Sequence, residues 1–365
     1  MNITEVLVQP QAIAWLPWAV QYFFYIGSAY AAAILFFIAL LFEPHTSHRL
    51  RAALVLTLAI GAIVGPLALT GDLHQPGRAW HFFAHLTPWS WMSLGSLFLP
   101  LFSGLAVVTA WLYLRSDLIN LENQPSKVLR TLAKIALGRW ETSRKVMLSF
   151  AALTVLSGLT IALYTGAEIA AVKSRELWHQ PASPLMWFVT AFFGAVGFSL
   201  LIWLLIPAKR KMLTQGDTQL LRKTSVLSGI LAFLLIPIWV SNYSGSSLYS
   251  YSDWVYHIAL LLALFSVSVL LPLFTLRHPT GHTIPLGGLS VITLATAWAV
   301  RWVTLMEVQT IARFDIGPYP YDLPMGSNGL LGIVGMFGLW IALALLSSEL
   351  IQPKCESTSS TSTQC

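Results

Sequence analysis

Charged side chains are scarce in this sequence, and their scarcity excludes an ordinary soluble domain. Only 10% of the 365 residues are Asp, Glu, Lys or Arg, whereas 56% are hydrophobic. A soluble protein of this length needs more charge to cover its surface. Mostly apolar runs of about 20 residues, the length that crosses a bilayer, recur along the chain. We therefore predict an all-α, polytopic membrane protein whose helices form one bundle.

Cysteine is almost absent, which excludes a cysteine-ligated metal centre within this chain. The two cysteines, Cys355 and Cys365, lie in a Ser/Thr-rich tail, so they build neither a disulfide framework nor an iron–sulfur cluster. The sequence also offers no pair of histidines placed to face each other inside the bundle, as a membrane b-type haem normally needs. We expect no haem and no metal in this chain, so that any iron–sulfur cluster belongs to a partner.

The apolar runs predict nine transmembrane helices. They leave no stretch long enough for a separate globular domain, so residues 1–351 are expected to form one transmembrane domain. The polar, low-complexity tail, residues 352–365, is expected to be disordered and cytoplasmic. The predicted spans, to within about three residues at each end, are 15–42, 50–71, 91–114, 147–171, 184–207, 225–244, 254–276, 284–308 and 328–351.

Basic residues divide unequally between the two sets of alternating loops, and this division predicts the orientation. One set carries only Arg78, Lys173, Arg175 and Arg313, whereas the other set and the tail carry nearly all the remaining Lys and Arg. By the positive-inside rule, the amino terminus lies outside and the tail lies in the cytoplasm. The net charge of +6 then follows from topology, and we expect no nucleic-acid partner.

Ionisable groups inside a bilayer are costly, so each one is a functional candidate. With the predicted orientation, the candidates of this sequence converge in the outer half of the membrane. They are Asp72 and His74 after the second span, Tyr164 and Glu168 four residues apart on one face of the fourth span, Arg301 in the eighth span, and Tyr22 early in the first.

Such a group of residues is what a quinol site requires. The site needs an apolar slot open to lipid, with a few polar groups that hydrogen-bond the ring oxygens and accept their protons. The alternative is that the groups only satisfy one another, for example as an ion pair between Asp72 and Arg301. Both interpretations stay open at the level of the sequence, and they are compatible.

Two segments carry a resemblance to a known family. The segment ALTGDLHQPGRAWHFFAHLTPWSWMSLGS, residues 68–96, and the segment YTGAEIAAVKSRELW, residues 164–178, are similar to the NrfD/PsrC family of membrane subunits. Within that family the chain most resembles the tetrathionate reductase branch, to which three further segments are similar. These are AWLPWAVQYFF at 14–24, AVRWVTLMEVQT at 299–310 and LPMGSNGLLGIVGMFGLWIAL at 323–343.

The resemblance implies a haem-free subunit that binds menaquinol or ubiquinol in the bacterial inner membrane. Its implied partners are a ferredoxin-like iron–sulfur subunit and a molybdopterin catalytic subunit, both on the outer face. Tyr164 matches a family tyrosine at the quinone, and Asp72 matches an acidic position beside it. Tyr22 falls where the polysulfide reductase relative has a quinone-contacting histidine, and a phenol with a reference pKa of about 10 is a poor proton acceptor.

These expectations combine into one functional hypothesis with two alternatives. Tyr22 and Tyr164, with Arg301, bind the quinol, and Asp72 with His74 or Glu168 accepts its protons, while electrons pass to the iron–sulfur partner of a reductase for tetrathionate. The first alternative is a family member serving polysulfide or another acceptor. The second is a secondary transporter, although transporters place their charges near the midplane and often show repeats. The outer loop 313–328 is either a docking surface or a plain connection.

Overall fold

The structure is a computed structural model that describes residues 13–73, 75–207, 211–243, 248, 252–311 and 321–351. Within these ranges the regular structure is entirely helical, and nine helices are long and apolar enough to cross a membrane. The prediction of an all-α, polytopic membrane protein is therefore confirmed. The predicted tail, residues 352–365, lies outside the described residues, as does His74.

The nine long helices follow the predicted spans closely. Between them lie two short helices, α3 (His81–Ala84) and α5 (Lys127–Ala133), and α10 continues through a π-helical turn, Val303–Glu307, into α11 (Val308–Thr310). The long helices are α1 (Pro17–Leu41), α2 (His48–Asp72), α4 (Trp91–Asn120), α6 (Arg144–Ala170), α7 (Ala182–Leu205), α8 (Gln215–Ser241), α9 (Ser252–Thr275), α10 (Thr283–Trp302) and α12 (Leu330–Ser348).

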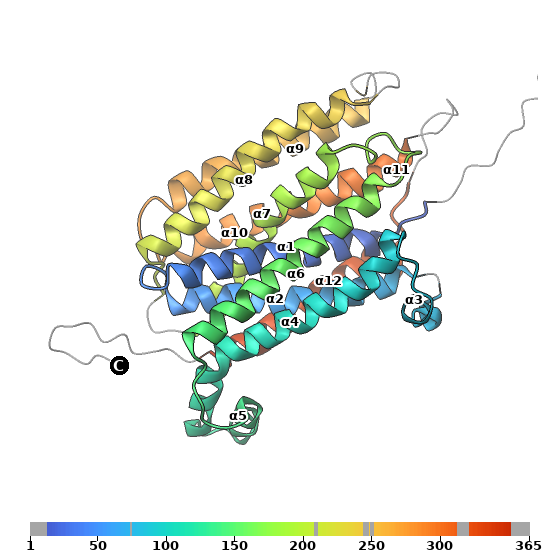
Figure 1. Ribbon diagram of the computed structural model, residues 1–365. Coiled ribbons are helices and arrows are strands. Elements are labelled where there is room, and N and C mark those ends of the chain that lie inside the picture. Colours follow the sequence, from blue (N-terminus) through green and yellow to red (C-terminus); the bar gives the residue numbers. More distant parts are fainter. Residues whose placement is uncertain are drawn as a thin grey trace, which may run out of the picture.

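Helix α1 occupies the centre of the bundle and is buried on nearly all sides. It packs against α2, α6 and α7, while α8 and α9 flank α7 and α10 on one side of the molecule. Helices α4 and α6 form the opposite flank, and α12 packs on α2 (Figure 1). A helix that is apolar all round belongs in a core, and α1 is such a helix because 20 of its residues are buried and most of these are apolar.

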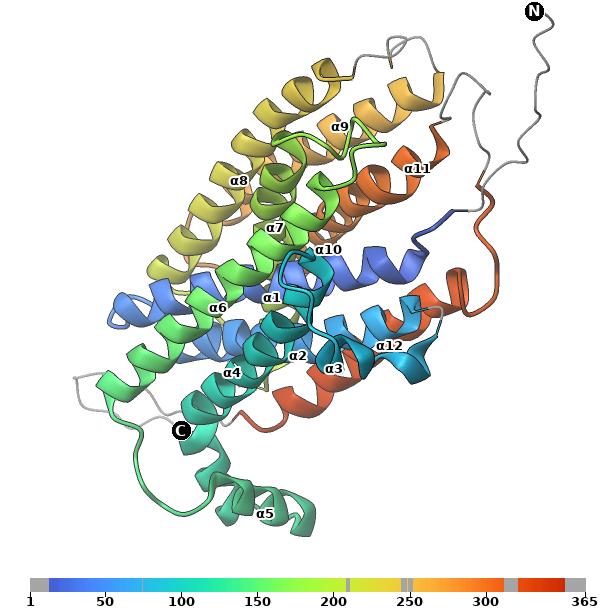
Figure 2. The same ribbon diagram turned by 45° about the vertical axis from the view of Figure 1, so that its right-hand side comes forward.

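The two ends of the bundle differ in composition. At one end, here the α3 end, α1 begins, α2 and α6 end, and the short helix α3 lies in the connection from α2 to α4 (Figures 1 and 2). At the other end, here the α5 end, α5 projects beyond the long helices (Figure 2). The basic loops of the sequence lie at the α5 end, so the predicted orientation would place it in the cytoplasm.

Two helices extend further than their apolar runs predict. Helix α8 starts at Gln215, ten residues before the predicted span, because the side chains of Thr214 and Asp217 cap its first turn reciprocally. Such a capping box satisfies two backbone N–H groups that a helix start otherwise leaves free. Helix α4 continues beyond the predicted residue 114 through Arg115 and Asp117, both of which are buried and hydrogen-bonded. The predicted spans end where the sequence becomes polar. The helices of the structure continue through these polar residues because capping and buried hydrogen bonds satisfy them.

Candidate functional site

Four of the predicted site residues meet at the α3 end of the bundle. The Tyr164 hydroxyl on α6 interacts with the Tyr22 hydroxyl on α1 and with the Glu168 carboxylate one turn along α6. The Asp72 carboxylate, at the last residue of α2, adds its charge to the field at Glu168. Three helices thus bring two phenols and two carboxylates to one place.

Tyr164 is held by its contact with α4. The side chain is almost fully buried, and its ring lies directly over Gly95. A Cβ atom at position 95 would overlap Cζ of Tyr164 and lie only 2.7 Å from Cε1 of the same ring. Since unbonded carbon atoms cannot approach so closely, only glycine allows the tyrosine ring to occupy this position.

Asp72 joins the end of α2 to the start of α1. Its Oδ1 accepts a hydrogen bond of 3.1 Å from the backbone N–H of Leu16, the residue before α1. The neighbouring residue, Trp15, is fixed by Gln309, whose amide accepts from Trp15 N–H and donates to Trp15 C=O, both at 3.0 Å. The entry of the chain into α1 is therefore tied to α2 and α11, which fixes the height of Tyr22 in the bundle.

The Tyr22 hydroxyl is the least satisfied polar group of the cluster. Tyr22 is fully buried, and its hydroxyl completes no hydrogen bond of normal geometry, although the Tyr164 hydroxyl lies close enough to interact. Its ring contacts Phe23 at 4.8 Å between centroids, and Phe23 in turn contacts Trp187 at 4.5 Å. A buried hydroxyl without a partner is costly, so this atom has hydrogen-bonding capacity for a ligand.

Arg301 lies in a different part of the membrane interior. Its guanidinium donates 2.7 Å to Thr190 Oγ1 and 2.9 Å to the Trp187 carbonyl, both on α7, and it interacts with Tyr30. Tyr30 is eight residues further along α1 than Tyr22, a rise of about 12 Å. Within the described ranges, Arg301 makes no hydrogen bond or ion pair with the four residues of the cluster. Tyr30, which it contacts, nevertheless acts electrostatically on Tyr22.

The ion pair between Asp72 and Arg301 that the sequence left open is not formed. Within the described ranges, the ion pairs within 4.0 Å involve other groups, and the hydrogen-bond acceptors of Arg301 are a hydroxyl and two backbone carbonyls. Its Nε has no partner. Arg301 is thus a buried cation that is held by neutral groups, and its proposed contact with a quinol stays a prediction.

A cavity of about 440 Å³ opens beside the cluster at the α3 end. It borders Leu73, the residue after Asp72, and Ser93, two residues before Gly95. His81 and His85, at the two ends of the α3 turn, also line it, with 5.7 Å between their ring centroids. The cavity is thus lined by titratable groups and by neighbours in sequence of the cluster.

Sequence reasoning missed the residues that position the site. Gly95 beneath Tyr164, Gln309 at the start of α1, and Tyr30 and Thr190 around Arg301 were not identified. Gly95 lies within a segment that resembled the family, but a single glycine in a long apolar helix does not indicate which side chain packs against it. Gln309 and Thr190 carry no charge, so the search for costly ionisable groups passed over them.

The described residues contain no group of three or more His, Cys, Asp or Glu side chains that would hold a metal ion. The α3-end cluster itself offers hydroxyls and carboxylates. Two carboxylates accept protons, and two phenols hydrogen-bond an oxygen placed against them. Such a donor set fits a quinol, whose oxidation releases two protons along with two electrons.

The sequence is similar to known reductase subunits over nearly all its length. Residues 5–312 match the family described as polysulphide reductase, NrfD. The chain is 35% identical over 359 residues to a tetrathionate reductase subunit of Salmonella typhimurium, an alignment that covers 95% of each protein. It is 22% identical over 373 residues to a selenate reductase subunit of Mesobacillus selenatarsenatis, covering 93% of this chain and 85% of the relative.

Proposed function

This chain belongs to the polysulphide reductase NrfD family, and on that premise we propose that it is the quinol-oxidising membrane subunit of a bacterial respiratory reductase. The proposed partners are an iron–sulfur subunit, which takes the electrons, and a molybdopterin subunit, which reduces the acceptor. Among acceptors, tetrathionate is favoured because the relative with 35% identity belongs to a tetrathionate reductase. Selenate, polysulfide or another acceptor is the second candidate, supported by the selenate reductase relative.

The observation that carries this proposal is the meeting of Tyr22, Tyr164, Glu168 and Asp72 at one end of the bundle. The hydroxyls of Tyr22 and Tyr164 are neighbours, so we assign both to the same ring oxygen of the quinol. The unpartnered, fully buried Tyr22 hydroxyl supports this assignment, because a ligand oxygen would satisfy it. The quinol, when bound, supplies two electrons and two protons.

In this proposal the carboxylates handle the protons. Glu168 lies one turn from Tyr164 and takes a proton from the oxygen that the two phenols hold. Asp72, with His74 in the segment after it, takes the second proton, and both protons leave to the α3 surface. Menaquinol and ubiquinol both fit this role. With the α3 end outside, proton release and acceptor reduction occur on the same side, so the subunit itself moves no net charge.

The surface of the α3 end supports a protein partner there. Three aromatic side chains of the segment around α3 are exposed, namely Trp80 and Phe83 at 59% each and Trp89 at 85%. Aromatic residues are enriched in the cores of protein interfaces. We propose that the iron–sulfur subunit packs over them, which would bring its nearest cluster to the side where Tyr22 and Tyr164 hold the quinol. The predicted docking loop, residues 313–328, is only described from Tyr321 onward.

The proposal is tested on the assembled complex with its partner subunits. Asp72→Asn should lower quinol oxidation by about a hundredfold, the usual contribution of a positioned acid or base. Tyr164→Phe should lower it as well, because it removes a hydroxyl that holds the ring oxygen. Tyr256→Phe is the matched control, because Tyr256 is 66% exposed on α9 and lies outside the cluster. Electron delivery to the acceptor from a dye that bypasses the membrane subunit should stay unchanged. Full quinol oxidation in both variants would show that the site lies elsewhere.

Purification of the same complex separates this function from that of a secondary transporter. A transporter needs no redox partner, whereas a subunit that transfers electrons should be purified together with an iron–sulfur protein. A chain that is purified alone, and that moves a solute without any redox activity, would favour the transporter.

A further inference from the structure

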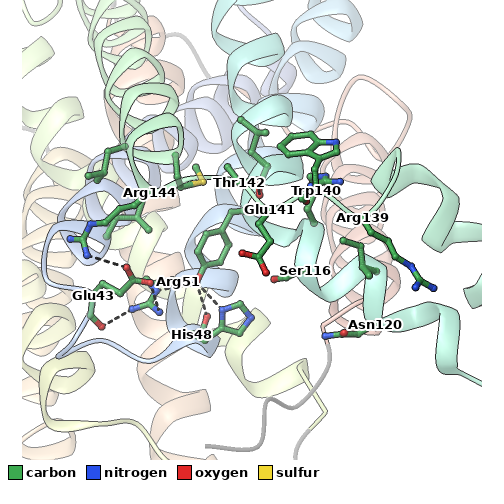
Figure 3. A pocket seen from close by; sticks show the side chains of 17 residues that line it. Glu43, His48, Arg51, Ser116, Asn120, Arg139, Trp140, Glu141, Thr142 and Arg144 are labelled. Atoms are coloured by element: carbon green, nitrogen blue, oxygen red, sulfur yellow. Dashed lines mark hydrogen bonds and ion pairs between the residues drawn. The ribbon is translucent and has the colours of Figure 1, made fainter.

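A second and larger cavity lies at the α5 end, far from the proposed quinol site. It measures about 580 Å³ and is lined by the ends of α1, α2, α4 and α6 and by the loop after α5. Figure 3 shows Glu43, Arg51 and Arg144 on one side of this cavity and Arg139 with Trp140 on the other. Its size is that of a ligand site, and the function proposed above does not use it.

The depth of this cavity follows from the length of α4. Trp111 is 20 residues after Trp91, the first residue of α4, and 20 residues rise about 30 Å, the thickness of the hydrocarbon core. The indole of Trp111 donates 2.9 Å to the Ile135 carbonyl. Arg115, one turn further, donates 2.9 Å to the Ala136 carbonyl. The chain after α5 therefore folds back to the depth of the lipid headgroups, where tryptophan is enriched.

The polar lining of this cavity has an excess of positive charge. Four arginines and two glutamates line it. Arg115 is fully buried and donates to the backbone carbonyls of Ala136, Gly138 and Trp140, with its guanidinium carbon 3.4 Å from the centroid of the Trp140 ring. Carbonyls and an indole do not cancel its charge, so the positive potential reaches into the cavity.

The other arginines have carboxylate partners. Glu43 lies between Arg51, at 3.3 Å, and Arg144, at 3.5 Å, so one carboxylate is shared by two guanidinium groups. Arg139 pairs with Glu122 at 2.5 Å, but 76% of its side chain is exposed. Glu141 also points into the cavity (Figure 3). An anion would therefore be attracted by the arginines and repelled by Glu141.

Trp140 lines the cavity, and it is exposed together with two apolar residues shortly before it in the chain, Ile135 and Leu137. Ile135 is 52% exposed, Leu137 71% and Trp140 46%. Leu137 adopts a left-handed backbone conformation, with φ of 53°, which is unfavourable for a residue with a Cβ and needs compensation from elsewhere. The exposed leucine side chain is also more stable against acyl chains than in water. A basic pocket and apolar side chains meet here at headgroup depth.

We propose that this cavity binds an anionic phospholipid, with its phosphate against the arginines and its acyl chains against Ile135, Leu137 and Trp140. Arg144 and Arg139 both line the cavity and are 58% and 76% exposed, so both can attract the phosphate. The acyl chains continue along the lipid-facing side of α6, where Leu153 and Leu156 are exposed. This proposal does not depend on the quinol site, and either one can fail alone.

The first test compares the lipid that copurifies with variants of equal charge. In the double variant Arg139→Ala/Arg144→Ala, the amount of retained phosphatidylglycerol, measured by native mass spectrometry, should fall at least about tenfold. Each basic residue near a membrane surface contributes about fivefold to the affinity for anionic lipid. The matched control is Lys223→Ala/Arg277→Ala, which removes two positive charges from the same end of the bundle but outside the cavity. Equal loss in the two double variants would overturn the proposal.

Two further variants test the site in other ways. One should fold normally and still bind less lipid, and the other should bind more lipid. Leu137→Gly relieves the left-handed backbone, so it should fold at least as well and yet retain several-fold less lipid. Glu141→Gln removes the repelling carboxylate and should retain about fivefold more. If Glu141→Gln retained less lipid, or Leu137→Gly retained as much as the unaltered chain, the proposed site would be refuted.

The last arm distinguishes a lipid from a free anion. Short-chain phosphatidylglycerol is added to the detergent-purified protein, with and without an excess of inorganic phosphate. A lipid site keeps the phosphatidylglycerol, because its acyl chains contribute most of the affinity. Displacement by inorganic phosphate would overturn the lipid assignment and leave a simple anion site. Equal binding of zwitterionic phosphatidylcholine would also overturn it.

Discussion

The ring of Tyr164 on α6 rests directly on the backbone of Gly95 on α4, so closely that a Cβ at position 95 would overlap Cζ of the tyrosine. The position of the proposed quinol-binding hydroxyl is therefore set by a residue on another helix. This contact makes the role of Tyr164 testable without removing its hydroxyl.

Gly95→Ala should displace the Tyr164 ring without removing any polar group of the site. We expect quinol oxidation to fall by about a hundredfold, since a shift of about 1 Å at a reacting group has that effect. Overpacking should also destabilise the protein by about 1–3 kcal/mol. The readouts are the quinol oxidation rate of the assembled complex and its thermal unfolding.

Gly104→Ala is the control for this change. Gly104 lies on the same helix, and no side chain or other helix comes within 4 Å of a Cβ built there. The same substitution should leave activity unchanged and favour the helix slightly. Matching activities of Gly95→Ala and Gly104→Ala would mean that the position of Tyr164 does not matter for quinol oxidation.

Tyr22→Phe removes a buried hydroxyl that has no complete hydrogen bond in the structure. Stability should change little, because the contact of this hydroxyl with that of Tyr164 is not a complete hydrogen bond. If a quinol oxygen is its partner, KM for quinol should rise about two- to tenfold, the contribution of one neutral hydrogen bond.

Tyr25→Phe provides the comparison. Tyr25 is also fully buried on α1, and its hydroxyl likewise has no partner, but it is not among the groups that act on Tyr164. This variant should match Tyr22→Phe in stability and the unaltered protein in KM. The assignment of Tyr22 fails if both variants give the same KM.

Arg301→Lys keeps the charge and loses the planar fork that reaches both Thr190 and the Trp187 carbonyl. We expect a loss of about 1–3 kcal/mol in stability, since a lysine cannot make both contacts and leaves buried groups unpaired. KM for quinol should stay unchanged because, within the described ranges, Arg301 makes no hydrogen bond or ion pair with the tyrosine and carboxylate cluster. A raised KM for quinol with unchanged stability would instead indicate that Arg301 contacts the quinol.

The orientation is testable with the native cysteines, because Cys355 and Cys365 are the two cysteines of the chain and both lie in the tail. A membrane-impermeant maleimide should label inside-out vesicles and leave intact spheroplasts unlabelled. A variant with both cysteines changed to serine controls for other labelled proteins. Labelling of intact spheroplasts would place the tail outside, and proton release at the α3 end would then be cytoplasmic.

The sequence predicted the spans well because apolar length is a requirement of the bilayer itself. It underestimated α4 and α8 at their polar ends, where the Thr214 and Asp217 cap and the buried Arg115 and Asp117 continue the helices. These features depend on hydrogen bonds between specific side chains, which hydropathy does not record.

For the site, the sequence determined which groups are costly in a membrane: Tyr22, Asp72, Tyr164, Glu168 and Arg301 were all identified from their chemistry and depth. Only the tertiary structure decided which of them meet. Depth along the membrane follows from position in a helix, but the rotation of each helix and its neighbours depend on packing. Packing set Tyr164 on Gly95 and turned Arg301 toward Thr190 on α7, because close approach of two helices is decided by shape and not by polarity.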